Sequence, residues 1–377
     1  MSETVITEQR RMLADSVADY CRRSDPLRRV RALRGTVPGF DRSAWREMAD
    51  LGWLGVMVPE RCGGLGLSIA EFAVVARASA AALVPEPLTA AMIATTAIVE
   101  SGNEPLQTVL LPKIVAGELI PALAWQETIG DLDPASITLA ARPRDGRVEL
   151  SGSKRFVVGA CGADGYVISA RDADGPALYW VPAGTPGLSE RTMQMADGRP
   201  VADLAFSGAS VPADHRLASG ETALRALAAA IDCGNLAISA ELIGIAHKSL
   251  DTTLDYLRTR TQFGKAIGAF QALQHRAVDL YMHRRVCDAT FDHALRMVEA
   301  SDDPLLRSAA ASRAKARSVD TARRITREAI QMHGAIGFTD DCDVGLYVKR
   351  AIVLSAWLGN ANAHRLRYAA LTPLEAQ

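Results

Sequence analysis

The spacing of hydrophobic and polar residues changes twice along the chain and divides it into three segments. Residues 1–118 and 216–377 carry apolar residues at steps of three and four, the period of a helix with one buried face. Residues 119–215 alternate apolar and polar positions between Gly, Pro and Asp breakers, which is typical of short strands. The pattern predicts a mostly α-helical protein with three domains: an N-terminal helical domain, a small antiparallel β-sandwich or barrel, and a C-terminal four-helix bundle.

The first segment contains clear signals for where its helices begin and end. Residues 7–21 are amphipathic, and Ser43 is expected to open a second helix that runs to Leu51. The loop PERCGGLGLS ends at Ser68, which is a favourable N-cap for the alanine-rich helix that follows.

In the middle segment, the sequence RPRDGRVELSGSK predicts a hairpin, because Asp145 and Gly146 are the residue types of a tight two-residue turn. The other expected strands have the sequences ELIPALAW, YVISAR, ALYWVPA and VADLAFSGASV.

The third segment predicts four long helices. The first two carry apolar stripes at Ile243, Ala246, Leu250, Leu254 and Leu257, and at Leu273, Ala277, Leu280, Cys287, Phe291, Ala294 and Val298. A third helix is expected to begin at Pro304 and to end at Gly334, because proline favours the first helical turn and glycine favours the C-cap. A fourth is expected over residues 344–368.

Composition narrows the classes of function. With 42 basic and 43 acidic residues, the net charge of −1 provides no footprint for nucleic acid or anionic lipid. The six cysteines are scattered without metal-ligand spacing, so we expect reduced thiols and no metal site. The N-terminus lacks the pattern of a secretory signal, and the apolar stretches read as too short and broken to span a membrane. We therefore expect a cytoplasmic protein.

The turn between the first two predicted bundle helices has the sequence RTRTQFGKAIGAFQALQH. It closely resembles the signature of the acyl-CoA dehydrogenases, at Arg260, Gln262, Phe263, Gly264, Lys265, Ile267, Gly268, Phe270 and Gln271. The resemblance implies a dinucleotide site, and the chemistry agrees: the Arg260 guanidinium can neutralise a pyrophosphate through paired hydrogen bonds, and Phe263 can cover an apolar part of a cofactor. A surface turn that happens to carry these residues is the alternative.

This resemblance covers nearly the whole chain and implies FAD as cofactor and an acyl-CoA as substrate. It also implies tetramers, or dimers of dimers, in which the Arg260 region reaches the FAD of a neighbouring subunit. A second matching segment, QMHGAIGF, implies that Gln331 and Gly334 approach the adenine half of FAD, although Ala335 replaces a usual glycine. A simple helix stop at Gly334 is the alternative.

Further matches concern the flavin ring. The segments PERCGGLGLS and LSGSKRFVVGA are similar to family motifs, and the second of these implies that Phe156 and Val158 flank the ring. Val158 replaces a hydroxyl residue, and around Gln126 the usual Thr-Glu-Pro-Gly pattern has become QETIGD. We therefore expect several hydrogen bonds to the ring to be absent, and whether the chain holds FAD alone stays open.

The family reaction removes an α-proton from the thioester while a hydride moves to flavin N5, which requires a positioned carboxylate. The resemblance places Leu358 at the usual position of this glutamate, and leucine cannot accept a proton. At the alternative position used by some members we find Gly234, followed by Asn235 where arginine is frequent.

Two other carboxylates are candidates for the base. Asp232 lies two residues before Gly234, so a small error in register would make it the base. Glu241 is further along the same predicted helix and is expected to be structural, with a catalytic role as the alternative. The acidic run of Asp340, Asp341 and Asp343 is expected to form a solvated loop.

Three functions stay open from the sequence. The chain resembles base-lacking subunits of heteromeric acyl-CoA dehydrogenases of steroid or dicarboxylate catabolism, which complete a shared FAD site with a second subunit. It could instead be a self-sufficient homo-oligomer that uses Asp232, or a non-redox descendant that binds a partner or an acyl thioester. An electron-transferring flavoprotein is the acceptor that the family implies. The small residues Gly234, Ala237 and Ser239 would leave room for a bulky or ring-containing acyl chain.

Overall fold

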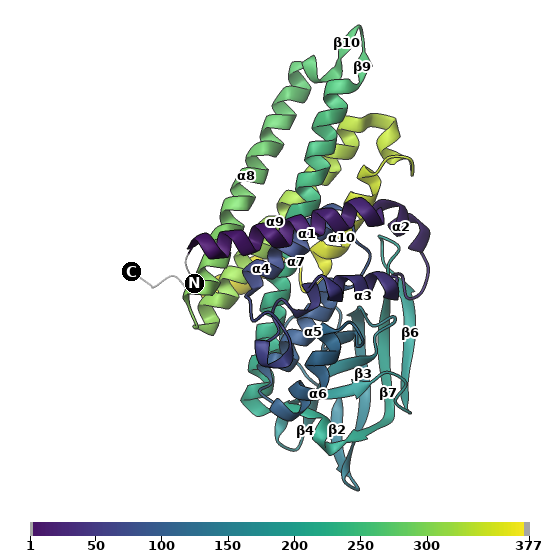
Figure 1. Ribbon diagram of the computed structural model, residues 1–377, viewed down its shortest axis with the longest axis vertical. Coiled ribbons are helices and arrows are strands. Elements are labelled where there is room, and N and C mark those ends of the chain that lie inside the picture. Colours follow the sequence, from purple (N-terminus) through teal and green to yellow (C-terminus); the bar gives the residue numbers. More distant parts are fainter. Residues whose placement is uncertain (1–2, 373–377) are drawn as a thin grey trace. The chain divides into compact units, whose positions relative to one another are not determined.

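The computed structural model of the protein describes residues 3–372, which form two compact units (Figure 1). The helical unit comprises the described part of residues 1–32, 69–84 and 235–377, and the sheet unit comprises residues 33–68 and 85–234. The secondary structure changes type close to residues 118 and 215, but the division into three domains at these positions stays a prediction.

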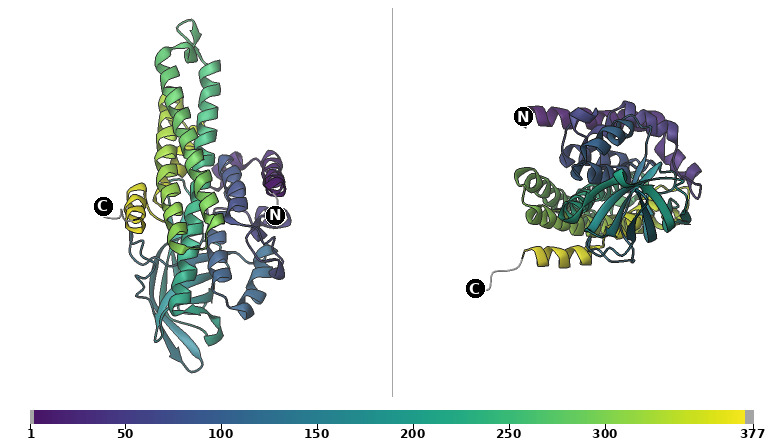
Figure 2. Two further views of the ribbon diagram at one scale, coloured as in Figure 1. Left: turned by 90° about the vertical axis from the view of Figure 1, so that its left-hand side faces the viewer. Right: turned by 90° about the horizontal axis from the view of Figure 1, so that it is seen from below.

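The helical unit is dominated by long helices. In Figures 1 and 2, α7, α8 and α9 lie side by side, and α11 packs against α9. The helices are α1 (Glu3–Ser24), α2 (Pro26–Leu33), α4 (Ile69–Ala81), α8 (Gln271–Ala300), α9 (Pro304–His333), α10 (Val344–Ala356), α11 (Ala361–Leu371) and the larger part of α7 (Gly220–Thr259).

The predicted limits of α9 are confirmed, and local chemistry explains them. The Asp303 side chain accepts a hydrogen bond of 2.9 Å from the Leu305 N–H, and Pro304 occupies the first helical position. At the other end, Gly334 has φ 68° and ψ −144°, a conformation that is accessible essentially to glycine alone.

The prediction of one continuous fourth bundle helix is wrong. The segment is broken into α10 and α11, because Leu358 has φ 56° and Gly359 has φ 106°, and neither value is helical. Asn360 then begins α11 by accepting hydrogen bonds of 3.0 Å from the N–H groups of Asn362 and Ala363.

The sheet unit contains one eight-stranded sheet with the strand order β6-β7-β3-β2-β4-β5-β8, and β1 pairs with β4. Most pairs are antiparallel, as expected, but β1 and β2 each pair with β4 in parallel, which makes the sheet mixed. The strands are β1 (Pro121–Ala124), β2 (Ala140–Arg144), β3 (Arg147–Val158), β4 (Gly165–Asp172), β5 (Gly175–Pro182), β6 (Leu188–Gln194), β7 (Pro200–Pro212) and β8 (Arg216–Ser219).

The predicted hairpin joins β2 and β3. Arg144 pairs with Arg147, and Asp145 and Gly146 between them have φ values of 50° and 75°. Positive φ at both central positions defines a type I′ turn, whose twist matches that of the flanking strands. The alternation of β3 then directs Val148 and Leu150 into the core of the sheet.

The remaining helices of the sheet unit are α3 (Arg42–Asp50), α5 (Leu88–Glu100) and α6 (Glu104–Val115). The cap of α3 is Asp41 rather than Ser43, since the Asp41 carboxylate accepts the Ser43 N–H at 2.8 Å. The alanine-rich stretch after Ser68 forms two helices, α4 and α5, because Pro85 and Pro87 interrupt it.

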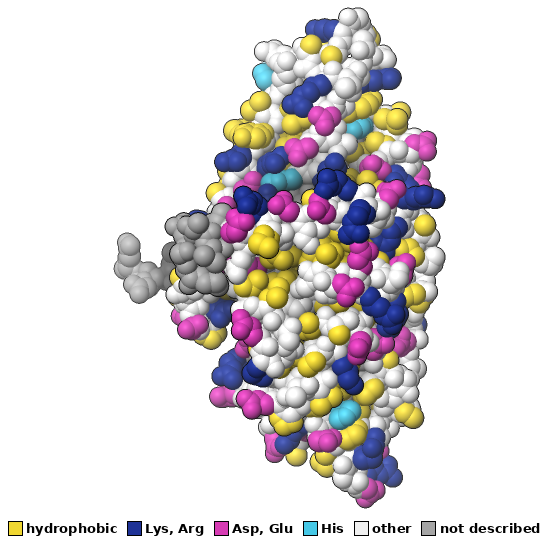
Figure 3. All heavy atoms as spheres, in the orientation of Figure 1, with side chains coloured by type: hydrophobic (Ala, Val, Ile, Leu, Met, Phe, Trp, Pro, Cys, Tyr) yellow, Lys and Arg dark blue, Asp and Glu magenta, His cyan; other side chains and the backbone are white. Residues whose placement is uncertain are grey.

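Among residues 3–372, α7 is long and apolar enough to cross a membrane by length and composition. The expectation that every apolar stretch is short and broken is therefore wrong for α7. However, 89% of its most apolar window is buried inside the protein, as in a core helix. On the face shown in Figure 3, acidic and basic side chains alternate, in agreement with the balanced composition.

Candidate functional site

A short hairpin, β9 (Thr261–Gln262) and β10 (Lys265–Ala266), links α7 to α8 and presents Phe263 at its tip. Phe263 has φ 54° and Gly264 has φ 79°, so a type I′ turn holds them. The Phe263 side chain is 89% exposed and meets the Phe270 ring edge-on at 6.1 Å between centroids. A strained, exposed aromatic residue of this kind is suited to contact another molecule.

Arg260 lies at the base of this hairpin. Its backbone is fixed by two hydrogen bonds of 2.8 Å, from its N–H to the Tyr256 carbonyl and from the Ile267 N–H to its own carbonyl. Its side chain is exposed and forms no ion pair with any residue between 3 and 372. Gln262 and Gln271 are exposed beside it. This group of donors can bind a phosphate or pyrophosphate.

The C-terminal end of α9 lies at the same end of the helical unit as the C-terminal end of α7, which leads into the β9–β10 hairpin. The rings of Tyr256 on α7 and His333 on α9 stack with centroids 4.4 Å apart, so the C-terminal ends of these two helices, which lead into the two predicted FAD motifs, lie close together. Gln331 is exposed on the last turn of α9. A Cβ added to Gly334 would meet no atom within 4 Å, so open space lies beside its backbone.

On the sheet unit, Phe156 is presented by a β-bulge. The register between β3 and β7 shifts between Lys154 and Val157, which turns the Phe156 side chain outward to 43% exposure at φ 54°. The Asp203 carboxylate accepts the Phe156 N–H at 2.9 Å and holds the bulge in place. Val158, close by on β3, is half-buried, and its side chain has no hydrogen-bonding group to offer a ligand.

Lys154 was not predicted as a site residue, but it organises the segment around Gln126. Its buried Nζ donates to Glu127 Oε1 at 2.6 Å, Ser169 Oγ at 2.8 Å and the Trp125 carbonyl at 3.2 Å. Burial lowers the pKa of Lys154 to about 8, against the opposing effect of Glu127. An even number of positions along β3 separates Lys154 from the buried Val148 and Leu150, so all three side chains point to the same face of the strand. This spacing in the sequence could have indicated that Lys154 is buried.

Hydrogen bonds fix both Glu127 and Gln126 in place. Burial acts to raise the pKa of Glu127, but hydrogen bonds from Lys154 and Thr138 bring it below its ordinary value. The Gln126 side-chain amide donates to the Asp131 carbonyl at 3.0 Å, and the Gln126 backbone carbonyl accepts the Arg155 N–H at 2.7 Å. The Gln126 amide is thus used within the loop.

The expected position of the catalytic base is the loop between α10 and α11, with the sequence Trp357, Leu358, Gly359 and Asn360. Leu358 is buried, at 8% exposure. Its carbonyl accepts a hydrogen bond of 2.9 Å from His364 Nε2, and the Trp357 carbonyl accepts one from Lys315 Nζ. The loop is rigidly held, and its four side chains include no carboxylate.

Lys315 and His364 were also missed from the sequence. Lys315 is fully buried, and burial lowers its pKa to about 7, against the opposing effect of Glu241. Because His364 Nε2 donates to a carbonyl, its Nδ1 carries no proton, and burial followed by the charge of Lys315 lowers the His364 pKa to about 3. The signal for Lys315 was its place on the alanine-rich face of α9, between Ser312 and Val319.

Glu241 is engaged in a buried ion pair. Its Oε2 lies 2.9 Å from Arg350 NH2, and both side chains are less than 10% exposed. The Glu241 carboxylate is thus engaged by a side chain of this chain, as expected of a structural residue. The acidic run is partly structural as well, because Asp343 pairs with Arg31 at 2.8 Å.

The alternative base position lies within α7. Gly234 and Asp232 are buried there, and the neighbouring Ala237 and Ser239 are fully buried. The Asn235 carboxamide is fully buried, and its nitrogen and oxygen find no hydrogen-bond partner in the part of the chain that the structure describes. An unmet buried amide costs about 1–3 kcal/mol, so this position favours a bound polar group or water.

Comparison with known proteins identifies the family. The acyl-CoA dehydrogenase N-terminal domain model matches residues 7–118, and the C-terminal domain model matches residues 224–371. The acyl-CoA dehydrogenase IpdE2 of Mycobacterium tuberculosis is 30% identical over 91% of each chain. The chain belongs to the acyl-CoA dehydrogenase family, whose cofactor is FAD.

Two solved structures show the same fold. A variant of the steroid acyl-CoA dehydrogenase Tcur3481–Tcur3483 has a TM-score of 0.85 at 29% identity, with 98% of this chain and 97% of that chain covered. The ChsE4–ChsE5 complex of Mycobacterium tuberculosis has a TM-score of 0.88 at 25% identity, with 100% and 99% covered.

The two units differ in how well they fit FAD. The helical unit offers exposed glutamines, the Phe263 ring and an Arg260 side chain that has no ion pair among residues 3–372, and these groups suit the phosphates and the aromatic parts of a dinucleotide. The sheet unit offers Phe156, but Val158 lacks a hydroxyl and the Gln126 amide is bound within its own loop. Among the described residues predicted to flank the flavin ring, neither the Val158 side chain nor the Gln126 side-chain amide is available to bind it.

Proposed function

We propose that this protein is a subunit of a heteromeric, FAD-dependent acyl-CoA dehydrogenase that lacks its own catalytic base. In this complex a second acyl-CoA dehydrogenase subunit supplies the carboxylate, and this chain contributes Arg260, Gln262, Phe263 and Gln331 to a shared FAD site. The observation that carries the proposal is the rigid loop at Leu358, which has no proton acceptor.

Several features support this assignment. Glu241 is bound to Arg350, which removes it as a replacement base. The exposed Phe263 and the unpaired Arg260 lie on a protruding hairpin, where they can reach a neighbouring subunit. The similar structures include a two-component complex and a steroid enzyme, which favour a heteromer and a bulky acyl group.

When it is bound, FAD accepts the hydride of the desaturation. The residues of this chain would position it and exclude water. Arg260 would balance the pyrophosphate charge through paired hydrogen bonds, and Phe263 would cover an apolar part of the cofactor. Phe156 would pack beside the ring. Leu358 and its loop would form an apolar wall of the acyl site, and the α-proton would move to a carboxylate of the partner subunit.

The remaining parts of the proposal follow from the chemistry. We place the complex in the cytoplasm, in agreement with six free cysteines, and we assign an electron-transferring flavoprotein as electron acceptor. The small residues at positions 234, 237 and 239 on α7 would accommodate a ring-containing acyl chain, such as that of a steroid acyl-CoA.

A self-sufficient enzyme that uses Asp232 is the second candidate. The observation that favours it is that Asp232 is a buried carboxylate on α7, two residues from the expected alternative base position at Gly234. In this case, Asp232→Asn would abolish turnover by the chain alone.

The test is the visible absorbance of the purified protein, expressed alone and together with a second acyl-CoA dehydrogenase subunit. We expect little flavin in the chain alone and flavin in the co-purified complex. Arg260→Ala should lower the flavin content of the complex by about tenfold or more, through loss of a charge-assisted pair. The matched control is Arg258→Ala, which removes only an exposed pair with Asp255 at 2.9 Å. A full flavin complement in the chain alone, with turnover, would contradict the proposal.

A further inference from the structure

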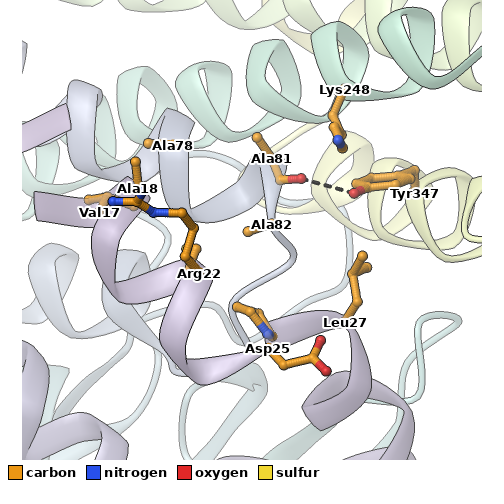
Figure 4. A pocket seen from close by; sticks show the side chains of 12 residues that line it. Val17, Ala18, Arg22, Asp25, Leu27, Ala78, Ala81, Ala82, Lys248 and Tyr347 are labelled. Atoms are coloured by element: carbon orange, nitrogen blue, oxygen red, sulfur yellow. Dashed lines mark hydrogen bonds between the residues drawn. The ribbon is translucent and has the colours of Figure 1, made fainter. Parts of the chain in front are cut away.

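A cavity of about 590 Å³ opens in the helical unit between α1, α2, α4, α7 and α10 (Figure 4). This volume lies within the range of small-molecule sites, roughly 300–1,000 Å³. None of the residues that line the cavity belongs to the FAD motifs or to the loop at Leu358. The cavity is therefore distinct from the candidate site described above.

The walls of the cavity are mainly apolar. Ala78 and Ala81 on α4 and Ala82 directly after it point short side chains toward the space, and Leu27 on α2 faces them (Figure 4). Tyr347 on α10 is fully buried, and its hydroxyl donates a hydrogen bond of 2.9 Å to the Ala81 carbonyl. This bond fixes the ring and satisfies its polar atom, so the Tyr347 ring offers the cavity an apolar surface.

One cation beside this cavity lacks a partner. Lys248 extends from α7 toward the space and forms no hydrogen bond or ion pair within residues 3–372 (Figure 4). The other charges nearby are balanced or distant. Arg22 pairs with Asp19, Arg31 pairs with Asp343 at 2.8 Å, and Asp25 lies on the far side of the space from Lys248.

We propose that this cavity binds a small amphipathic carboxylate. The apolar tail packs against the alanines of α4 and the Tyr347 ring, and the carboxylate pairs with the Lys248 ammonium group. The apolar walls provide most of the affinity, since each buried methylene contributes about 0.8 kcal/mol, and the ion pair provides the preference for an anion.

The experiment is calorimetric titration of the full-length protein with decanoate and with decanol, its uncharged counterpart. We expect one decanoate bound per chain, and decanol bound about tenfold more weakly. Lys248→Gln should weaken decanoate by about tenfold and leave decanol unchanged. Ala82→Phe, which fills the cavity, should abolish the binding of both ligands. The controls Lys113→Gln and Ala300→Phe, which lie away from the cavity, should bind as the wild type does.

Three results would overturn the proposal. The first is the absence of decanoate binding to the wild-type chain. The second is decanoate binding that survives both Lys248→Gln and Ala82→Phe, which would place the ligand in the acyl site or elsewhere. The third is an equal effect of Lys248→Gln on both ligands, which would exclude the ion pair. If Ala82→Phe fails to fold, the comparison of the two ligands in Lys248→Gln still decides the matter.

Discussion

The buried pair of Glu241 and Arg350 provides a sharp test of whether Glu241 is structural. Replacing Glu241 by leucine breaks its pair with Arg350, in which both side chains are less than 10% exposed, and it also removes a carboxylate whose charge acts on the buried Lys315. Removing one partner of such a buried pair costs about 3–5 kcal/mol, because the remaining charge loses the partner that offsets its desolvation. The Glu241→Leu variant should therefore lose about that much unfolding free energy.

The assay is urea denaturation followed by circular dichroism, with Glu241→Leu, Arg350→Met and the double variant measured side by side. The double variant removes both charges of the pair, so it should be more stable than Glu241→Leu by about 2 kcal/mol or more. The matched control is the exposed pair of Arg276 and Glu328, where Glu328→Leu should change stability by less than about 1 kcal/mol. Additive losses in the double variant, or a Glu241→Leu protein of wild-type stability that fails only in turnover, would refute this reasoning.

Three further predictions concern Lys315, His364 and Phe263. Because the pKa of Lys315 is about 7 in the folded protein and 10.5 is its ordinary value, the unfolded chain binds more protons in this window, and stability should rise with pH above 7. Between pH 7 and 8, Lys154 contributes little to this rise, because its own pKa is about 8. Lys315→Met should therefore remove the rise in unfolding free energy between pH 7 and 8. An unchanged dependence on pH in urea denaturation would contradict this prediction. The pKa of His364 is lowered from 6.5 to about 3, so stability should fall as the pH falls through that range, and His364→Gln should flatten the acid limb of the curve. Phe263→Ala, at a side chain that is 89% exposed, should change the stability of the chain by less than about 0.5 kcal/mol and still weaken its complex with a second subunit; a fully assembled variant complex would count against the proposed role of the hairpin.

The sequence predicted most of the fold because the elements obey strong local rules. The period of the apolar residues located α7 and α8, and Pro304 and Gly334 predicted the two ends of α9. The break between α10 and α11 could not be predicted from period, because the apolar pattern continues through it. It depends on positive φ at Leu358, in a loop whose carbonyls accept hydrogen bonds from His364 and from the distant Lys315.

The candidate site was predictable only where its residues form contiguous motifs. Arg260, Phe263 and Gln331 were found because short stretches carry unusual residue combinations, and the structure brings them to one end of the helical unit. Lys154, Lys315 and His364 escaped notice because their roles depend on partners that are 27, 42 and 6 residues away. Burial of a lysine follows from tertiary packing, which a local pattern does not encode.

The central claim is that this chain has no catalytic base of its own. The most direct measurement is the anaerobic addition of an acyl-CoA to the chain alone, reconstituted with FAD, with the flavin absorbance followed over time. The account predicts no bleaching of the flavin by straight-chain or ring-containing acyl-CoAs, and bleaching when the second subunit is present. Bleaching by the chain alone, abolished in Asp232→Asn, would contradict the account and identify Asp232 as the base.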